Sequence, residues 1–243
     1  MQRMQQTPGT TMPEEKSPLS EYRLDNVDCS ICGNTGTVTR IDENGFLWSR
    51  DCVCMKRRRS LRNIEDSGLR DLVRRYSFEN YKTPTPKHDA IKKKAMSFCA
   101  NDAECFIIMG KSGAGKTHIC TAICKTLIEN NWQCRYLIWR TDAARLKSIV
   151  NDGEEYEREI NKLKNSAVLY IDDFFKGTIT DADKNLAFTL LNDRYNGRGK
   201  KTIISTELTI PELLEADEAT AGRIIERARG YTIQAPSENW RLK

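Results

Sequence analysis

A glycine-rich stretch at residues 110–117, with the sequence GKSGAGKT, restricts the fold of this chain more than any other feature. It follows an apolar run at 105–109 and precedes a segment of helical periodicity that starts at Thr117. In such a strand–loop–helix, glycines let backbone N–H groups turn inward, and the positive end of the helix points at the same place. The pattern predicts that Lys116 contacts the outer phosphates of a nucleotide and that the Thr117 hydroxyl binds magnesium. The alternative, a glycine-rich turn with a chance lysine, does not account for the flanking strand and helix.

Strand-like and helix-like segments alternate around this loop. The expected strands are apolar runs at 105–109, 134–139, 167–172, 202–206 and 231–234. The expected helices are segments of helical periodicity at 89–99, 117–129, 141–150, 154–164, 183–195, 211–216 and 218–228. Continuous apolar strands between amphipathic helices predict an α/β fold with a five-stranded parallel sheet covered by helices on both faces.

Two carboxylates, Asp172 and Asp173, follow the apolar strand at 167–172. A parallel strand beside the phosphate-loop strand would bring Asp172 into the coordination sphere of magnesium. Asp173 would then orient or deprotonate the water that attacks the terminal phosphate. An acidic turn after a buried strand is the alternative, but the phosphate loop upstream favours a nucleotide site.

Arginines near the C-terminus are candidates for contacts with the transition state. Arg223 and Arg227 are one helical turn apart and share a face of the expected helix. A planar guanidinium on this face could neutralise charge at the terminal phosphate of a neighbouring subunit. Arg241 could reach the nucleotide of its own subunit. Each of these arginines could instead form a surface salt bridge.

Four cysteines near the N-terminus have the spacing C-x2-C and C-x-C, at Cys29, Cys32, Cys52 and Cys54. Turn residues and alternating stretches between the two pairs predict a zinc ribbon built from β-hairpins. The ion would supply the folding free energy of so short a segment, on the order of 10 kcal/mol. Four ordinary thiols are the alternative. The other cysteines occur in apolar segments and are expected in the core, at 99, 105, 120, 124 and 134.

The composition excludes few classes of function. No apolar stretch approaches the roughly 18 residues of a membrane span, so we expect no membrane partner and a cytoplasmic location. A net charge of +5 permits nucleic-acid binding without arguing for it. Nine cysteines in a reducing compartment favour metal binding or buried thiols over disulfides.

Taken in order, the motifs resemble those of the bacterial and phage DnaC-type helicase loaders, with the IstB-type transposition helper ATPases nearby. The resemblance rests on GKSGAGKTH (110–118), LYIDDFFKG (169–177), TIISTEL (202–208), DEATAGRIIER (217–227) and ENWRL (238–242). The segment 77–81 also resembles the family's lead-in to the adenine pocket, and the cysteine ribbon resembles the N-terminal module of Gram-positive and phage loaders.

The resemblance implies an AAA+ P-loop ATPase that uses ATP and Mg²⁺ and carries Zn²⁺ in its N-terminal module. Such a protein would bind the replicative hexameric helicase through that module, deliver it to single-stranded DNA during replication initiation, and form an ATP-dependent homo-oligomer. Two alternatives stay open. One is an IstB-like helper that binds duplex DNA and a transposase, and the other is a zinc adaptor that uses ATP as a structural ligand.

The resemblance also implies roles for individual residues. The catalytic set would comprise Lys116, Asp172, Asp173, the finger candidates Arg223 and Arg227, of which Arg223 is favoured, and Arg241 as a second sensor. The nucleotide would be bound by Gly110, Lys111, Ser112, Gly113, Ala114, Gly115, Lys116, Thr117 and His118, together with Thr206 or Glu207 on the strand between the loop strand and the acid strand. Glu207 departs from the Asn common at this place. The candidates for contacts with DNA phosphates are Arg140, Arg145 and Lys147.

We expect four segments along the chain. Residues 1–20 are polar and expected to be disordered. Residues 21–62 would form the zinc-binding helicase-interaction module, 63–88 a basic helical connector, and 89–243 the AAA+ ATPase domain. The basic run that starts at 56–59 could contact nucleic acid or an acidic partner, or it could be a solvated helix face.

Overall fold

The computed structural model describes residues 29–42 and 44–240. The chain divides into two compact units with a boundary between Arg58 and Arg59, inside helix α1 (Cys54–Ser67). The segment expected to be disordered, 1–20, lies outside the described residues. Within the described ranges, no helix is both long and apolar enough to cross a bilayer.

The first unit contains a single hairpin within residues 29–42 and 44–58. Strands β1 (Thr37–Ile41) and β2 (Leu47–Asp51) pair antiparallel. The Asp42 carboxylate closes the turn by accepting hydrogen bonds from the N–H groups of Asn44 and Phe46, both at 2.9 Å. An isolated two-stranded hairpin is marginally stable in water, so this unit needs another source of folding free energy.

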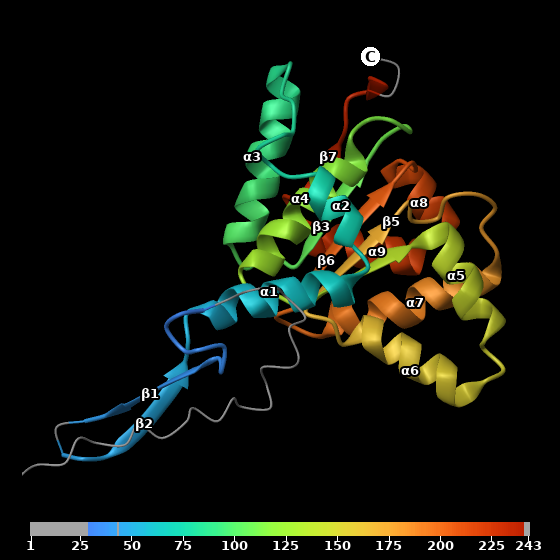
Figure 1. Ribbon diagram of the computed structural model, residues 1–243. Coiled ribbons are helices and arrows are strands. Elements are labelled where there is room, and N and C mark those ends of the chain that lie inside the picture. The colour runs from blue at the N-terminus through green and yellow to red at the C-terminus, as the bar shows by residue number, and fades with distance from the viewer. Residues whose placement is uncertain (1–28, 43, 241–243) are drawn as a thin grey trace, which may run out of the picture. The chain divides into compact units, whose positions relative to one another are not determined.

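The second unit is built on a five-stranded parallel sheet, as predicted, and its strand order is β4-β5-β6-β3-β7 (Figure 1). Its strands are β3 (Cys105–Met109), β4 (Cys134–Ile138), β5 (Val168–Asp172), β6 (Lys201–Thr206) and β7 (Thr232–Gln234). The acid strand β5 is not beside the loop strand β3, so the placement expected from the residues alone was wrong, whereas the placement implied by the family resemblance was right. Strand β6 pairs with both and lies between them.

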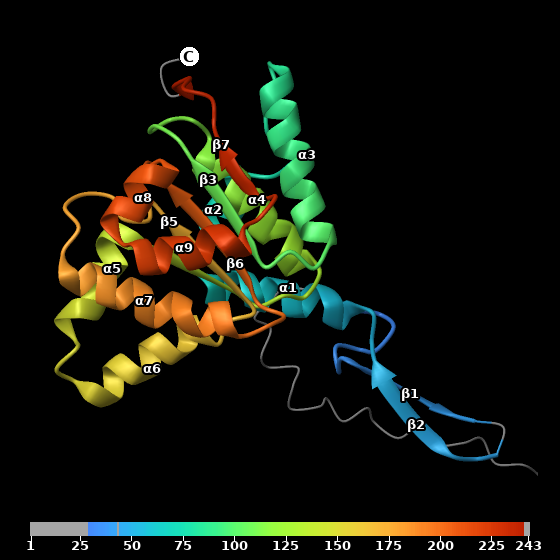
Figure 2. The same ribbon diagram turned by 180° about the vertical axis from the view of Figure 1, so that it is seen from behind.

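Helices cover both faces of this sheet (Figures 1 and 2). Their bounds are α2 (Arg70–Arg75), α3 (Pro86–Ala100), α4 (Lys116–Glu129), α5 (Trp139–Ser148), α6 (Gly153–Lys164), α7 (Asp181–Asn196), α8 (Ile210–Ala216) and α9 (Glu218–Arg227). Helices α2, α3 and α4 pack on one face, and α5 to α9 pack on the other. Trp139, expected as the last residue of a strand, instead begins α5.

The alternation of side chains along each strand divides the core into two layers. In β3, Phe106 and Ile108 belong to the layer beneath α3 and α4, whereas Ile107 belongs to the layer beneath α7 and α9. All five residues of β3 and of β5 are buried. Strands covered on both faces have no polar side, which explains why these runs are continuously apolar.

The segment 63–88, expected to be a connector, is part of the second unit. Leu69, Val73, Phe78 and Tyr81 are buried in the core layer that also contains α3 and α4. Their burial explains how this basic segment is held in place, because its apolar side chains face the core. The second unit therefore begins well before residue 89.

A buried guanidinium, that of Arg194 on α7, joins the end of α6 to the start of β6. Its nitrogens donate to the carbonyls of Lys164, Ser166 and Lys201 at 3.2, 2.7 and 2.7 Å, and to the hydroxyl of Thr202 at 3.0 Å. The residue is only 5% exposed. Removing the guanidinium would leave several buried carbonyls without a donor.

We expect Arg194→Met to lower the free energy of unfolding by about 3 kcal/mol, because unpaired buried polar groups lose their solvation without compensation. Urea denaturation followed by circular dichroism measures this change. Arg198→Met, which removes an exposed arginine nearby, should change stability by less than about 0.5 kcal/mol. Equal effects of the two substitutions would contradict a structural role for Arg194.

Candidate active site and candidate metal centre

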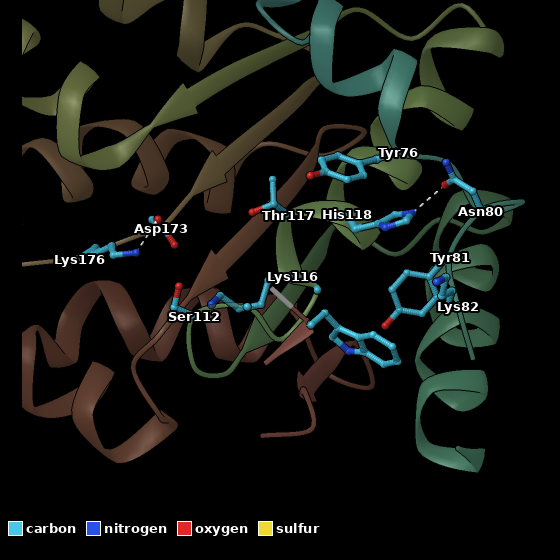
Figure 3. A pocket seen from close by; sticks show the side chains of 13 residues that line it. Tyr76, Asn80, Tyr81, Lys82, Ser112, Lys116, Thr117, His118, Asp173 and Lys176 are labelled. Carbon is cyan, nitrogen blue, oxygen red and sulfur yellow. Dashed lines mark hydrogen bonds and ion pairs between the residues drawn. The ribbon is translucent and has the colours of Figure 1, made fainter. Parts of the chain in front are cut away.

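A cavity of about 400 Å³ lies where β3 and β5 end (Figure 3). Its walls come from the segment 76–82, the loop and first turn of α4 at 112–118, the strand-end residues Asp173 and Lys176, and Trp240. The cavity therefore brings together the phosphate loop and the acid pair, the two motifs predicted to form a nucleotide site. Its aromatic wall comes from Tyr76, Tyr81 and Trp240.

The phosphate loop has the backbone that its glycines permit. Gly113 and Gly115 have φ values of +81° and +82°, a conformation that side-chain-bearing residues rarely adopt. Gly115 is the residue immediately before α4, so the N–H groups of the first turn point into the cavity. A Cβ atom on Gly113 would also collide with the side chain of Asn239.

Lys116 lies at the centre of this loop and is largely buried. Its ammonium donates hydrogen bonds to the carbonyls of Gly110, at 2.7 Å, and Lys111, at 3.1 Å. Burial lowers the pKa of Lys116, and the charges of Asp173 and Glu207 act in the opposite direction. The ammonium is thus held within the loop, close to where an anion would bind.

The carboxylate of Asp172 lies beside Thr117, as the magnesium prediction requires. The Thr117 hydroxyl is 3.3 Å from both carboxylate oxygens. Tyr170 and Tyr136 donate to the same carboxylate at 2.7 and 3.0 Å, and Ser205 donates as well. Hydroxyl and carboxylate oxygens are the ligands that Mg²⁺ prefers, so this pair fits the ion.

The two tyrosines hold the carboxylate as permanent donors. Burial raises the pKa of Tyr170 and of Tyr136, and the negative charge of Asp172 raises both further. Neither tyrosine was predicted as a site residue. The alternation of strand β5 offers a signal for Tyr170, because residues two apart in a strand share a face.

Strand β6 contributes Ser205 to the site rather than Thr206. The Ser205 hydroxyl also accepts the N–H of Asp173 at 3.0 Å. The Thr206 hydroxyl instead donates to the carbonyl of Phe174 at 2.8 Å. Neither Ser205 nor Thr206 lines the cavity, and Ser205 acts on the site through its bond to Asp172. Adjacent strand residues point to opposite faces, which places Ser205 and Thr206 on different sides of the sheet.

The other sensor candidate, Glu207, forms an ion pair with Lys176 at 2.9 Å. Lys176 also donates to the carboxylate of Asp173 at 2.9 Å. Burial acts to lower the pKa of Lys176, but its bonds to Glu207 and Asp173 outweigh this and raise it. Lys176 was missed in the sequence because no phosphate-loop motif assigns a lysine three residues after the acid pair.

The opposite end of the cavity is aromatic. The His118 ring lies between Tyr76 and Tyr81, with centroid distances of 4.7 and 5.1 Å. Its Nε2 donates to the carbonyl of Ser77 at 3.0 Å, and burial lowers the pKa of His118. His118 therefore orients the tyrosines, and the aromatic rings, with Trp240, offer apolar faces suited to a planar base.

The predicted finger arginines do not line this cavity. Arg227 forms an ion pair with Glu104 and donates to the carbonyl of Tyr195. Arg223 donates to the carbonyl of Ala219 at 2.9 Å, and its guanidinium lies 5.2 Å from the centroid of the Phe188 ring. Both are on α9, and Arg241 lies outside the described residues.

In the first unit, the four cysteines converge. The sulfur atoms of Cys29, Cys32, Cys52 and Cys54 all lie within 4.8 Å of one another, with pairs at 3.7 and 3.6 Å. Thiolates bound tetrahedrally to zinc at about 2.3 Å are roughly 3.8 Å apart. Burial opposes ionisation, but the N–H of Gly36 and the neighbouring thiols lower the pKa of Cys32 to about 6. The geometry fits a zinc ion.

The sequence pattern of a known family, described as "IstB-like ATP binding protein", matches residues 37–242. The chain belongs to this family. Together with the five-stranded sheet, the family identifies an ATPase of the AAA+ class. The resemblance seen in the sequence is thereby confirmed for the family and the fold.

Individual relatives of this IstB-like protein are consistent with this family membership. "Phage-like element PBSX protein XkdC" of Bacillus subtilis is 28% identical over 229 residues, which are 88% of this chain and 84% of the relative. "Replicative helicase loader DnaC" of Escherichia coli is 26% identical over 172 residues, 69% of each chain. The crystal structure of DnaI has the same fold, with a TM-score of 0.56 and 19% identity over 70% of this chain and 93% of its own.

We expect Ser205→Ala to reduce ATP turnover about tenfold while ATP binding is retained, because residues that orient a magnesium-binding carboxylate contribute at this level. Steady-state hydrolysis and nucleotide binding measure the two effects. Ser166→Ala is the matched control, since Ser166 is also buried and its hydroxyl has partners only outside the site, donating to the carbonyl of Leu163 and accepting from Arg194. A turnover loss shared by both variants would argue against the role of Ser205.

Metal analysis tests the cysteine centre. We expect about one zinc ion per chain in the parent protein and substantially less in Cys29→Ser or Cys52→Ser, because a structural site requires four ligands. Cys99→Ser, a change to a partly buried thiol of the second unit, should leave the zinc content unchanged. Equal metal content in all of these proteins would rule out the four-cysteine site.

Proposed function

We propose that this protein is an ATP-dependent helicase loader that binds the replicative hexameric helicase and delivers it to single-stranded DNA in the cytoplasm. The observation that carries the proposal is the presence, in one chain, of a built ATP cavity and a separate cysteine-centred unit. The relative named replicative helicase loader DnaC, which aligns over 69% of both chains, supports this class of partner.

The ATP site would work through the chain's own side chains. Lys116 would turn from the loop carbonyls to the outer phosphates, and Thr117 and Asp172 would hold a magnesium ion. That ion supplies positive charge that offsets the developing charge on the phosphate oxygens. Asp173 orients a water molecule whose oxygen bonds to the terminal phosphorus, and the bond from that phosphorus to the bridging oxygen breaks. ADP leaves with the bridging oxygen. One proton of the water passes to Asp173 and then to solvent, and the other stays on the released inorganic phosphate.

Subunit contacts would complete the site. In the proposed homo-oligomer, Arg223 or Arg227 on α9 of one subunit approaches the terminal phosphate bound by its neighbour. Arg223 remains the favoured finger, because Arg227 is already engaged by Glu104. Arg241 follows directly after Trp240, which lines the cavity, and is proposed to contact the nucleotide of its own subunit.

The hairpin of the first unit has the surface of a protein-binding module. Ile41, Phe46 and Leu47 are 69%, 72% and 71% exposed. Ile41 and Leu47 are partners across the closed end of the β1–β2 hairpin, and Phe46 directly precedes Leu47. Several large exposed apolar side chains on one small module are characteristic of a protein partner site. We assign this surface to the helicase.

A basic groove near α5 supports contact with single-stranded DNA. The groove has a volume of about 220 Å³ and is lined by Arg140, Lys147 and Lys176, among others. Lys147 is paired with Asp183 at 2.6 Å, and Arg145 lies 3.4 Å from the Glu159 carboxylate. Arg140 is exposed and lines the groove, which makes it the best placed of the three candidates for a DNA phosphate.

A transposition helper is the second candidate, because the matching family takes its description from IstB. That function predicts binding to duplex DNA and a transposase instead of a helicase. A zinc adaptor that holds ATP without turnover is the third, and the arrangement of Asp172, Asp173 and Thr117 argues against it.

Co-purification with candidate replicative helicases tests the proposal. We expect a stable complex that survives Lys116→Ala and is lost when Phe46 and Leu47 are both changed to serine, because the hairpin carries the exposed apolar surface. Lys116→Ala should lower ATP turnover and helicase delivery to single-stranded DNA about 100-fold or more. The matched surface control is Met96→Ser with Leu214→Ser, which changes two exposed apolar residues of the other unit.

Two results would overturn helicase loading. The first is delivery of helicase by Lys116→Ala at the parent rate. The second is the recovery of a complex with duplex DNA and transposase, but with no helicase, from the unchanged protein.

A further inference from the structure

The strand-end lysine Lys176 occupies an unusual place in the ATP cavity. Its ammonium lies 2.9 Å from a carboxylate oxygen of Asp173 and 2.9 Å from one of Glu207. Asp173 is the residue expected to orient the attacking water. Figure 3 shows Lys176 joined to Asp173 on the side of the cavity that also holds Ser112 and Lys116. The base-binding tyrosines are on the other side, so Lys176 is at the terminal-phosphate end.

The backbone that carries these two residues is firmly fixed. Asp173 and Phe175 have φ values of +54° and +57°, which cost free energy in non-glycine residues. The N–H of Phe174 donates to the Ser205 carbonyl at 2.8 Å, and the rings of Phe174 and Phe175 stack in the core at 4.0 Å. These contacts favour a response to nucleotide at the ends of the Asp173 and Lys176 side chains over a movement of the backbone.

The surroundings of Lys176 allow its ammonium to leave its two carboxylate partners for another anion. The side chains of Lys176, Asp173 and Glu207 are each about one-third exposed, so their contacts are open to competition. A flexible four-carbon stem lets a lysine ammonium move between nearby anions. The terminal phosphate of ATP would bring up to about two negative charges to this end of the cavity, whereas ADP would bring none there.

We propose that Lys176 is a positioning residue that responds to the terminal phosphate. Without that phosphate, Lys176 occupies the Asp173 carboxylate and is anchored by Glu207. With ATP bound, its ammonium moves to the terminal phosphate and leaves Asp173 to accept a hydrogen bond from the attacking water. The inference rests on ATP binding in this cavity, which is part of the proposed function, and it adds a device that makes hydrolysis depend on a correctly seated triphosphate.

Nucleotide affinity tests the proposal without relying on turnover. Lys176→Met should lower the affinity for a non-hydrolysable ATP analogue about tenfold, as expected for one charge-assisted phosphate contact, and change ADP affinity less than about twofold. Lys176→Arg, which keeps the charge, should restore most of the preference for the analogue. Glu207→Gln removes the carboxylate that holds Lys176. The Lys176 ammonium would then reach the terminal phosphate more readily, and analogue affinity should increase about threefold.

Lys184→Met is the matched control. Lys184 pairs with Asp181 at the same three-residue spacing, but outside the cavity, so both nucleotide affinities should be unchanged. A thermal unfolding midpoint close to that of the parent shows that Lys176→Met is folded.

Equal losses of affinity for the analogue and for ADP, or an unchanged analogue affinity in Lys176→Met, would overturn the proposed movement of Lys176. Its role would then be limited to holding the turn at 173–176 to Glu207. Failure of the parent protein to bind either nucleotide would overturn the ATP-dependent function itself. Loss of helicase binding with an intact nucleotide preference would affect only the assignment of the partner.

Discussion

The buried carboxylate of Asp172 connects four elements of the ATPase unit. It accepts hydrogen bonds from Tyr136 on β4, Tyr170 on β5, Ser205 on β6 and Thr117 on α4. A buried charge is stable only when its hydrogen-bonding capacity is met, so these donors must stay in register. The same requirement fixes the carboxyl ends of β4, β5 and β6 against α4, the helix that follows the phosphate loop. The same hydrogen bonds thus stabilise this end of the sheet and set the geometry of the metal site.

Much of this arrangement is encoded locally and could be predicted. The phosphate loop, the acid pair and the four cysteines are each contained in short motifs whose chemistry requires that spacing. Strand positions were also predictable, because buried parallel strands are uninterrupted apolar runs. The ends of the strands and helices differ from the predicted ones by a few residues. The clearest case is Trp139, which was expected to end β4 but begins α5.

The remaining features depend on contacts between segments distant in sequence. The place of β6 between β3 and β5 came only from the family resemblance, and the register of the assembled sheet decides that Ser205 rather than Thr206 faces Asp172. Lys176 is anchored only because Glu207, which directly follows β6, is brought to the turn after β5. The segment 63–88 looked like a connector because its charges are conspicuous, while its few apolar residues decide where it packs.

The contact between the phosphate loop and the C-terminal segment has a consequence for interpreting substitutions. The N–H of Trp240 donates to the carbonyl of Gly113 at 3.0 Å, and the side chain of Asn239 fills the space where a Cβ of residue 113 would be. Glycine is therefore required at this position for two independent reasons, one conformational and one steric. Loss of activity in a variant of Gly113 would report the displaced docking of this segment as much as a damaged phosphate cradle, and the aromatic wall containing Trp240 would be disturbed in the same variant.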